Sequence, residues 1–378
     1  MTKFSLYLPC VLLIAALITA CANKQQHVAD NHFLDEVRNK LESGEEFARS
    51  QPFEVREFSP WLDGKWIGQA ASYGCYREGQ APGNSGPGKA EILEDLQIIA
   101  RHWNLIRVYN ADDDTQRILE VIRESGLPLK VMLGVWLENE ENNPEAGRSN
   151  INNVLRGIDL ANEYPNIVAA VNVGNETQVF WSGHKLDTAS LIRYIRVVRN
   201  HTEVPVTTAD DYNYWNKPES RKVADEVDFI VTHIYPLWNG KTLGNAIQWL
   251  DKTYNEVSQV HPQKLLVLGE IGWATNYNPD KKGDGEQGTL IKGDVSVGAQ
   301  ETFLFELDEW VHNNDVITFL FEVFDEPWKG GGEASGPSEI EKNWGVFYQD
   351  RTPKISFINY LSKKEQKNED QFFERREK

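Results

Sequence analysis

From about residue 62 onward, short apolar runs alternate with longer segments whose apolar residues recur at helical spacing. The runs are typical of buried β-strands, and each segment between two of them is long enough for one crossover helix. The expected strands are Trp66–Ser72, Leu105–Tyr109, Lys130–Trp136, Ile167–Val173, Val206–Ala209, Phe229–His233, Leu265–Gly269 and Val316–Phe324. The expected helices cover residues 88–103, 113–125, 149–164, 187–201, 219–226, 244–260, 298–314 and 353–362.

Eight strands that alternate with eight helices are the element count of a closed (β/α)8 barrel. An open, doubly wound sheet is the alternative, and it usually carries a glycine-rich phosphate turn after its first strand. Gly83, Gly86 and Gly88 follow the first strand here, but they do not form a GxGxxG pattern. We therefore predict a single-domain α/β protein, a (β/α)8 TIM barrel over residues 61–362, with a short N-terminal tether.

The two ends of the chain differ in composition from this region. Residues 1–20 contain Lys3 and then an apolar run too short to span a bilayer, which is the pattern of a secretory signal. Residues 21–60 are polar and weakly helical in pattern, and we expect a tether and leading segment there. Residues 363–378 alternate Lys, Glu, Asp and Gln, which indicates a solvated, partly disordered tail.

The residues Ile18-Thr19-Ala20-Cys21 at the end of the signal resemble the lipobox of bacterial lipoproteins. The resemblance implies cleavage before Cys21 and acylation of that residue, and two or more acyl chains anchor a protein stably. It implies a protein of the bacterial cell envelope that touches the membrane only through its N-terminal lipid. Ala22 after the cysteine favours the outer membrane. A cleaved signal with an incidental cysteine is the alternative.

Composition and charge narrow the classes of partner. The chain has 378 residues and a formal net charge of −18, which disfavours nucleic acid, because phosphate binding needs a basic face. Of the three cysteines, only Cys75 remains after signal removal and acylation, and we expect a buried thiol there. The absence of an HExxH motif and of a close His/Cys cluster predicts neither metal nor cofactor. No pattern predicts an oligomer, so we expect a monomer.

Two glutamates follow apolar strands at the end of the barrel that carries the active site in this fold. Glu176 closes residues 173–176 (Val-Gly-Asn-Glu), and Glu270 lies in residues 269–273 (Gly-Glu-Ile-Gly-Trp). The fourth and seventh strands stand roughly opposite in an eight-strand ring, so the two side chains can meet across its mouth. Two carboxylates about 5–5.5 Å apart perform retaining glycoside hydrolysis. A structural hydrogen-bonding role for each glutamate is the alternative.

These segments are among several that resemble glycoside hydrolase family 17, the β-1,3-glucanase family of retaining (β/α)8 enzymes. The resemblance extends from about Trp66 to Tyr360, and several motifs in the right order make it specific. They are residues 76–80 (Tyr-Arg-Glu-Gly-Gln), 106–109 (Ile-Arg-Val-Tyr), 173–176, 269–273, 324–329 (Phe-Asp-Glu-Pro-Trp-Lys) and 344–345 (Trp-Gly).

The resemblance implies that Glu176 is the general acid/base and Glu270 the nucleophile. Glu176 must then stay protonated, so burial or a neighbouring carboxylate should raise its pKa. Glu270 must stay ionised, so hydrogen-bond donors should surround it, and the phenols of Tyr109 and Tyr235 are expected to hold it. Asn175 would donate to a sugar 2-hydroxyl, a contact that strengthens in the transition state.

Further residues are expected around the cleft. Glu326 and Lys329 match the acidic and basic positions that flank the family's cleft, with Glu322 as a buried supporting carboxylate and Glu341 as another cleft carboxylate. Aromatic rings at or beyond the strand ends would bind sugars, with packing under loops as the alternative for each. They are Trp136, Trp181, Tyr212, Tyr214, Trp215, Trp238, Trp273, Trp328 and Trp344. The insertion at 276–294 would wall one end of the cleft.

Residues and resemblance together predict a retaining glycoside hydrolase that cleaves β-1,3-glucosidic bonds of laminarin-type glucans by double displacement. The expected partner is a β-1,3-glucan polysaccharide or oligosaccharide. One alternative is a β-1,3-glucan transglycosylase, in which an acceptor sugar replaces water at the glycosyl–Glu270 intermediate. The other is a non-catalytic, glycan-binding surface lipoprotein. The sequence does not distinguish cleavage within the glucan chain (endo) from cleavage at its end (exo).

Overall fold

The computed structural model describes residues 33–278, 289–330 and 339–376, apart from the side chains of 368–376. The expected signal and Cys21 lie outside the described residues. The chain divides into two units, Met1–Phe47 and Ala48–Lys378. In the first unit, residues 33–42 form a helix. None of the helices in the described ranges is long and apolar enough to cross a membrane.

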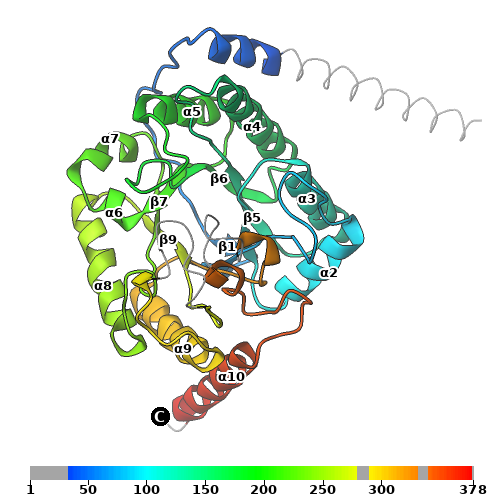
Figure 1. The fold of residues 1–378 in the computed structure, drawn as a ribbon, viewed down its shortest axis with the longest axis vertical. Helices are drawn as coiled ribbons and strands as arrows, with labels where there is room; N and C mark the ends of the chain where they lie inside the picture. Colours follow the sequence, from blue (N-terminus) through cyan, green and yellow to red (C-terminus); the bar gives the residue numbers. More distant parts are fainter. Residues whose placement is uncertain (1–32, 279–288, 331–338, 377–378) are drawn as a thin grey trace, which may run out of the picture. The chain divides into compact units, whose positions relative to one another are not determined.

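The second unit is a closed barrel of eight parallel strands, which confirms the predicted (β/α)8 fold (Figure 1). In ring order the strands are β3 (Gln69–Ser72), β4 (Leu105–Arg107), β5 (Lys130–Val135), β6 (Val168–Asn175), β7 (Val206–Asp211), β8 (Ile230–His233), β9 (Leu266–Ile271) and β10 (Thr318–Leu320). The ring closes where β10 pairs with β3 in parallel, with Phe319 opposite Ala70.

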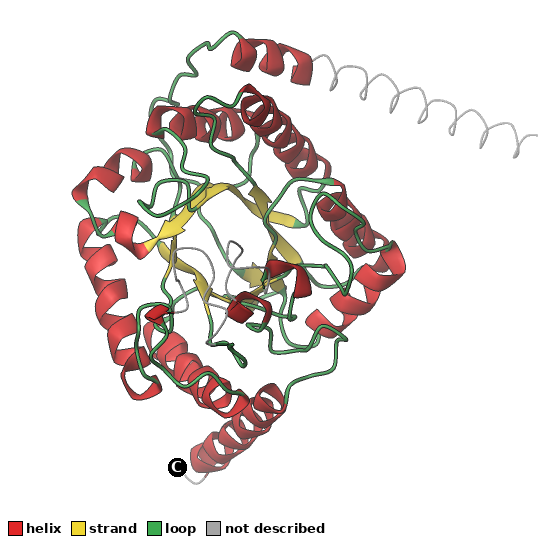
Figure 2. Ribbon diagram, viewed as in Figure 1, coloured by secondary structure: helices red, strands yellow, loops and turns green. Residues whose placement is uncertain are grey.

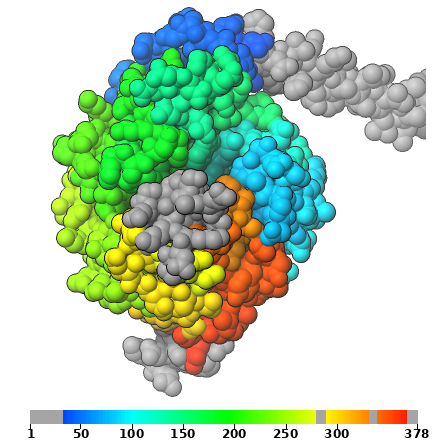
Figure 3. Space-filling view, viewed as in Figure 1, coloured from blue at the N-terminus to red at the C-terminus, as the bar shows by residue number. Residues whose placement is uncertain are grey.

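Helices surround the strands on the outside of the ring, as Figure 2 shows. They are α2 (Lys89–Ile99), α3 (Asp113–Ser125), α4 (Pro144–Glu163), α5 (Thr188–His201), α6 (Tyr212–Trp215), α7 (Arg221–Ala224), α8 (Leu243–Val260), α9 (Val297–Asn314) and α10 (Ile355–Arg376). Figure 3 shows the same face with its atoms filled in, and the sequence colours from cyan to red follow one another around the ring. Each β/α segment therefore packs beside its neighbours in the chain.

Apolar side chains that point inward from the strands fill the interior of the barrel. Leu105, Met132, Ala170 and Val231 are fully buried members of this cluster. Because successive strand residues alternate between the interior and the helix layer, the next inward positions toward the carboxyl ends of the strands lie above this layer. Arg107 on β4 is one of them, and it is fully buried.

The first expected barrel strand begins later than predicted, because Trp66 belongs to a separate hairpin. Strands β1 (Trp61–Leu62) and β2 (Lys65–Trp66) pair in antiparallel fashion. The two residues between them, Asp63 and Gly64, have φ of 50° and 77°, which is the conformation that a two-residue hairpin turn requires.

The eighth strand is shorter than predicted, since β10 ends at Leu320 and not at Phe324. The backbone N–H of Val323 donates to Ser72 of β3, while that of Glu322 donates to Trp344. The chain therefore leaves the regular ladder here.

The expected helix at 219–226 is a 3-10 turn, Pro218–Ser220, followed by the short α7, and the short α6 before them was not predicted.

Both flanks of the barrel are more ordered than predicted. The barrel unit begins at Ala48 rather than 61, because Arg56 donates its backbone N–H to Asp228 and Phe58 stacks on Phe229. The helix predicted for 353–362 is longer than expected, since α10 extends to Arg376. Lysines at helical spacing pair with acidic residues of α9: Lys363–Glu301 at 2.7 Å, Lys364–Asp308 at 2.6 Å and Lys367–Glu309 at 2.6 Å.

Candidate active site

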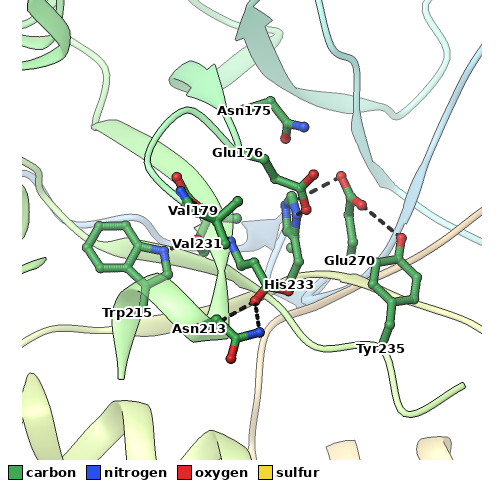
Figure 4. A network of polar contacts seen from close by, with 12 residues as sticks. Asn175, Glu176, Val179, Asn213, Trp215, Val231, His233, Tyr235 and Glu270 are labelled. Carbon is green, nitrogen blue, oxygen red and sulfur yellow. Dashed lines mark hydrogen bonds and ion pairs between the residues drawn. The ribbon is translucent and has the colours of Figure 1, made fainter. Parts of the chain in front are cut away.

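Glu176 and Glu270 face one another across the carboxyl ends of the strands. Glu176 directly follows β6 and Glu270 lies in β9, and Figure 4 shows their side chains directed toward each other. One carboxylate oxygen of each, together with a ring nitrogen of His233 on β8, lies within 4.8 Å of the others. The expected pairing of the two carboxylates across the barrel mouth is therefore present in the structure.

Donors surround the carboxylate of Glu270, as the sequence predicted. Arg107 Nη1 donates to Glu270 Oε1 at 2.9 Å, and the hydroxyl of Tyr109 donates to the same oxygen at 3.0 Å. The hydroxyl of Tyr235 donates to Glu270 Oε2 at 2.8 Å. Three donors, one of them a full positive charge, therefore hold this carboxylate in its ionised form.

Glu176 has a different environment, because its partner is a histidine. His233 Nδ1 lies 2.8 Å from Glu176 Oε1, and His233 Nε2 lies 3.1 Å from Nη1 of Arg107. A guanidinium only donates, so Nε2 is an acceptor and Nδ1 carries the proton that is donated to Glu176. Burial lowers the pKa of His233 to about 4, which keeps the ring neutral near neutral pH.

The charges in this group explain why the two glutamates differ. Arg107 supplies one positive charge, which Glu270 neutralises, so Glu176 has no counterion among the described residues. Burial, and then the charge of Glu270, raise the pKa of Glu176 well above its usual value. Burial alone would also raise the pKa of Glu270, but the charge of Arg107 and the hydrogen bonds from the two phenols hold it below its usual range. The pair therefore contains one acid and one base.

Asn175 is oriented by the same arginine. Its Oδ1 accepts from Arg107 Nη2 at 2.5 Å, and since the guanidinium has no acceptor, the amide oxygen must face it. The amide NH2 group then points away from Arg107 as a donor, which is the orientation that the predicted contact with a sugar hydroxyl needs.

The spacing of Glu176, His233 and Glu270 would also suit metal ligands. A bound cation would, however, face the guanidinium of Arg107, which already neutralises Glu270. We therefore assign no metal to these three residues.

A second acidic cluster follows β10. Lys329 Nζ lies 2.6 Å from Glu322 Oε2 and 2.5 Å from Glu326 Oε2, and the indole N–H of Trp328 donates to Glu326 Oε1 at 2.9 Å. Burial raises the pKa of Glu322, whereas Lys329 holds the pKa of Glu326 below its usual range in spite of burial. Gly74 is required beside this cluster, because a Cβ there would lie 2.1 Å from Glu326 Oε1. Lys329 therefore bridges two carboxyls rather than donating to one.

Glu341 also lies close enough to affect the site. Burial and, against the opposing charge of Lys329, the charge of Glu270 together raise its pKa to about 7. The predicted cleft carboxylate is therefore within electrostatic reach of the pair.

The predicted aromatic subsites divide into exposed and buried rings. Trp328 is 42% exposed, and Trp238 is half-buried against Trp344. The prediction that Trp273 binds a sugar is wrong. Its side chain is only 1% exposed, packs on Phe303 of α9 and donates its indole N–H to the backbone of Asp294. Its position after β9 points it into the helix layer, so it has no face for a sugar.

The other aromatic rings predicted to bind sugars differ in burial. Tyr214, Trp215 and Trp344 are buried in the core, Trp136 and Tyr212 are half-buried, and Trp181 is exposed. The insertion at 276–294 lies mostly outside the described residues, so its place at the cleft stays a prediction.

Neither Arg107 nor His233 was among the site residues predicted from the sequence. The available signal was their position, because each is a polar residue at the end of an otherwise apolar buried strand. Asp210, at the end of β7, was also missed, since the expected strand stopped at Ala209. The signal for it was that strand β7 ends in two aspartates, Asp210 and Asp211.

Two carboxylates at this distance, at the carboxyl ends of the strands of a (β/α)8 barrel, are the arrangement that retaining glycosidases use. Residues 70–345 match the family described as the BtgE/BtgC glycoside hydrolase domain, and this chain belongs to that family.

A curated relative, the glucan endo-1,3-beta-glucosidase btgC of Emericella nidulans, is 27% identical over 278 residues, which are 69% of this chain and 40% of the relative. The chain thus matches about two fifths of the relative's length.

Two solved structures share the fold. The endo-laminarinase from Formosa Hel1_33_131 is 23% identical with a TM-score of 0.64, and the match covers 79% of this chain and 88% of that one. The glycoside hydrolase family 17 beta-1,3-glucanosyltransferase from Rhizomucor miehei is 24% identical with a TM-score of 0.58, covering 76% and 95%.

Proposed function

We propose that this chain is a retaining glycoside hydrolase that cleaves β-1,3-glucosidic bonds of laminarin-type glucans by double displacement. The observation that carries the proposal is the carboxylate pair, in which oxygens of Glu176 and Glu270 lie within 4.8 Å in opposite electrostatic settings. Family membership supports the reaction class. The names of the relative and of both solved structures support a β-1,3-glucan as substrate.

In the first step, Glu176 donates its proton to the glycosidic oxygen while a carboxylate oxygen of Glu270 attacks the anomeric carbon. The bond between that carbon and the glycosidic oxygen breaks, and the shortened glucan leaves as an alcohol. The glycosyl group is then an ester of Glu270 on the opposite face of the ring. Asn175 donates to the 2-hydroxyl, where the contact strengthens as positive charge develops on the sugar.

In the second step, Glu176 is a carboxylate and takes a proton from a water molecule whose oxygen attacks the anomeric carbon. The ester bond breaks, Glu270 recovers its negative charge and Glu176 recovers its proton. Arg107, Tyr109 and Tyr235 favour this step, because they stabilise the carboxylate that departs. Two inversions at the same carbon give net retention.

Hydrolysis of laminarihexaose followed by proton NMR tests this proposal. We expect the first product to carry the β anomer and to mutarotate later, and we expect Glu270→Gln and Glu176→Gln each to abolish the reaction. A first product with the α anomer, or turnover by Glu270→Gln, would contradict the mechanism. Absence of turnover by the wild type would favour a glycan-binding protein instead. A panel of β-1,3-, β-1,4- and mixed-linkage glucans tests the substrate class.

Transfer to a second glucan is an alternative activity, which two exposed rings in the loop after Glu176 favour. Phe180 and Trp181 lie in the loop that follows Glu176, with 70% and 49% of their surfaces exposed. An acceptor sugar stacked on them would compete with water for the ester of Glu270. Early products longer than the substrate, and their loss in Trp181→Ala, would establish transfer. A time course without longer products would reject it.

We also propose that Cys21 carries a lipid that attaches the chain to the bacterial cell envelope, at the outer membrane. Support comes from the apolar run of residues 11–20 and the lipobox pattern alone. We expect incorporation of labelled palmitate and recovery in the membrane fraction of a Gram-negative host, with Cys21→Ser in the soluble fraction. Membrane association of unlabelled Cys21→Ser protein would refute the anchor.

A further inference from the structure

Glu176 is held in a backbone conformation that residues with a side chain rarely adopt. Its φ is 51°, in the left-handed region, and Gly174 two residues earlier has a φ of 79°. The pairing of β6 with β7 also changes register between Asn172 and Asn175. The end of β6 is therefore an irregular turn, and such strain persists only where the surroundings impose it.

A single buried carboxylate on the neighbouring strand holds the residues that follow Glu176. Asp210 of β7 is fully buried, and its Oδ2 accepts the backbone N–H of Gln178 at 2.7 Å. Its Oδ1 accepts the backbone N–H of Val179 at 3.2 Å and that of Asp211 at 2.9 Å. The N–H of Glu176 itself donates to the carbonyl oxygen of Ala209, beside Asp210, at 2.9 Å.

These contacts fix the turn at its strained residue, Glu176, and at the residues that follow it. The bond to Ala209 anchors the chain at Glu176, and the two bonds to Asp210 anchor it two and three residues later. No side chain with only one acceptor oxygen can receive both the Gln178 and the Val179 N–H in the same way. An amide in place of the carboxylate would also point an NH2 group at one of these donors.

We infer that Asp210 is a positioning residue, which clamps the turn after Glu176 and so holds the acid/base carboxyl opposite Glu270. The inference rests on the proposed role of Glu176 as proton donor. Loss of the clamp should weaken proton donation to the leaving group, while the nucleophile, held by Arg107 and two phenols on other strands, keeps its place.

The next residue provides a matched control. Asp211 is a buried carboxylate one position along the chain, but its Oδ1 accepts the backbone N–H of Asn213 and caps α6 at 2.8 Å. Asp211→Asn keeps an oxygen for this cap and leaves the turn after Glu176 untouched. The variants Asp210→Asn and Asp211→Asn therefore make the same change of side chain, without a change of size, at adjacent positions, and only the first removes a clamp.

Two substrates separate proton donation from every other part of the reaction. Laminarihexaose has a sugar leaving group that needs an acid, whereas a 2,4-dinitrophenyl β-laminaribioside releases a phenolate without one. For Asp210→Asn we expect kcat/KM on laminarihexaose to fall about 30-fold, a partial loss of general acid catalysis, and to change less than about threefold on the dinitrophenyl glycoside. Equal losses on both substrates, or a loss no larger than that of Asp211→Asn, would overturn the inference.

Glu176→Ala in the same assays separates this inference from the function on which it rests. If Glu176→Ala keeps its activity on laminarihexaose, the proposed acid is wrong. If Glu176→Ala loses that activity selectively and Asp210→Asn does not, only the clamp is wrong.

A measurement on the wild-type protein does not depend on the folding of any variant. We expect the amide hydrogens of Gln178 and Val179 to exchange with solvent far more slowly than that of Trp181 in the same loop. Exchange of all three at similar rates would overturn the clamp.

Discussion

Two clusters at the same end of the barrel each combine one cation with two glutamates, yet they are built differently. In the first, Arg107 contacts Glu270, and Glu176 has no counterion in the part of the chain that the structure describes. In the second, Lys329 lies between Glu322 and Glu326, within 2.6 Å of both. In both clusters burial raises the pKa of one carboxyl and the cation holds the pKa of the other low. Only in the second cluster does the cation also bind the carboxyl with the raised pKa, and so tie the two glutamates together. The first arrangement suits proton transfer and the second suits holding a loop.

The largest expected effect is on the carboxylate that the first cluster keeps ionised. Glu270→Gln removes the nucleophile while keeping the size of the side chain, so we expect kcat on laminarin to fall by about 10⁴-fold or more. Laminarihexaose should still bind within about tenfold of the wild-type Kd, because the cleft is unchanged. Steady-state kinetics and calorimetry measure the two quantities, and near-normal turnover would remove Glu270 from its proposed role.

The second largest effect tests the pairing of Arg107 with Glu270. Without the guanidinium, the pKa of Glu270 should rise, so activity should be lost at a higher pH as the solution is acidified. For Arg107→Gln we expect the acid limb of kcat/KM to move up by about 1–3 pH units. The alkaline limb, where Glu176 loses its proton, should stay above the usual range of a glutamate, since its raised pKa arises first from burial.

Arg156→Gln is the matched control for this change, because Arg156 pairs with Asp113 at the surface. Its pH profile should equal that of the wild type. An unshifted acid limb in Arg107→Gln, with the protein folded, would mean that Arg107 does not set the ionisation of Glu270.

The third effect is on stability and concerns the second cluster. Lys329→Met leaves Glu322 and Glu326 buried without a cation, and we expect the free energy of unfolding to fall by about 3 kcal/mol. Lys363→Met removes an exposed lysine from its pair with Glu301, and we expect a loss below about 1 kcal/mol. Urea denaturation measures both. Equal losses would show that the Lys329 bridge contributes no more than a surface pair.

The smallest effect distinguishes an exposed tryptophan from a buried one. Trp328→Ala removes a ring that the second cluster holds through its indole N–H, and we expect KM for laminarihexaose to rise about fivefold with kcat nearly unchanged. Trp273→Phe should lower the melting temperature without changing KM, because that ring packs in the core. A change of KM in Trp273→Phe alone would reverse the assignment of the two rings.

Much of the fold could be predicted from the sequence, because the barrel repeats one pattern of apolar runs and helical segments. The errors lie where local sequence and tertiary contacts disagree. Trp66 is apolar enough for a strand, but the turn at Asp63 and Gly64 directs it into a hairpin. The charged sequence of the C-terminal segment predicts a solvated tail. In the structure its lysines pair with acidic residues of α9, which are distant in the sequence.

The two glutamates of the site were predictable because their strands end in distinctive motifs. Their opposite ionisation was expected from the roles that the resemblance implies, but the contribution of Arg107 from β4 and His233 from β8 was not. These two residues are distant in sequence and meet only in the closed ring. The clamp of Asp210 was hidden for a similar reason, because backbone N–H groups carry no sequence signal.

The central claim is that Glu270 forms a covalent bond to the sugar while Glu176 transfers the proton. Trapping with 2,4-dinitrophenyl 2-deoxy-2-fluoro-β-laminaribioside tests it most directly, because the fluorine slows breakdown of the glycosyl ester and the phenolate needs no acid to leave. Peptide mass spectrometry of the inactivated protein should find the fluorinated disaccharide on Glu270. A label on any other residue, or inactivation of Glu270→Gln with the same label, would contradict the account.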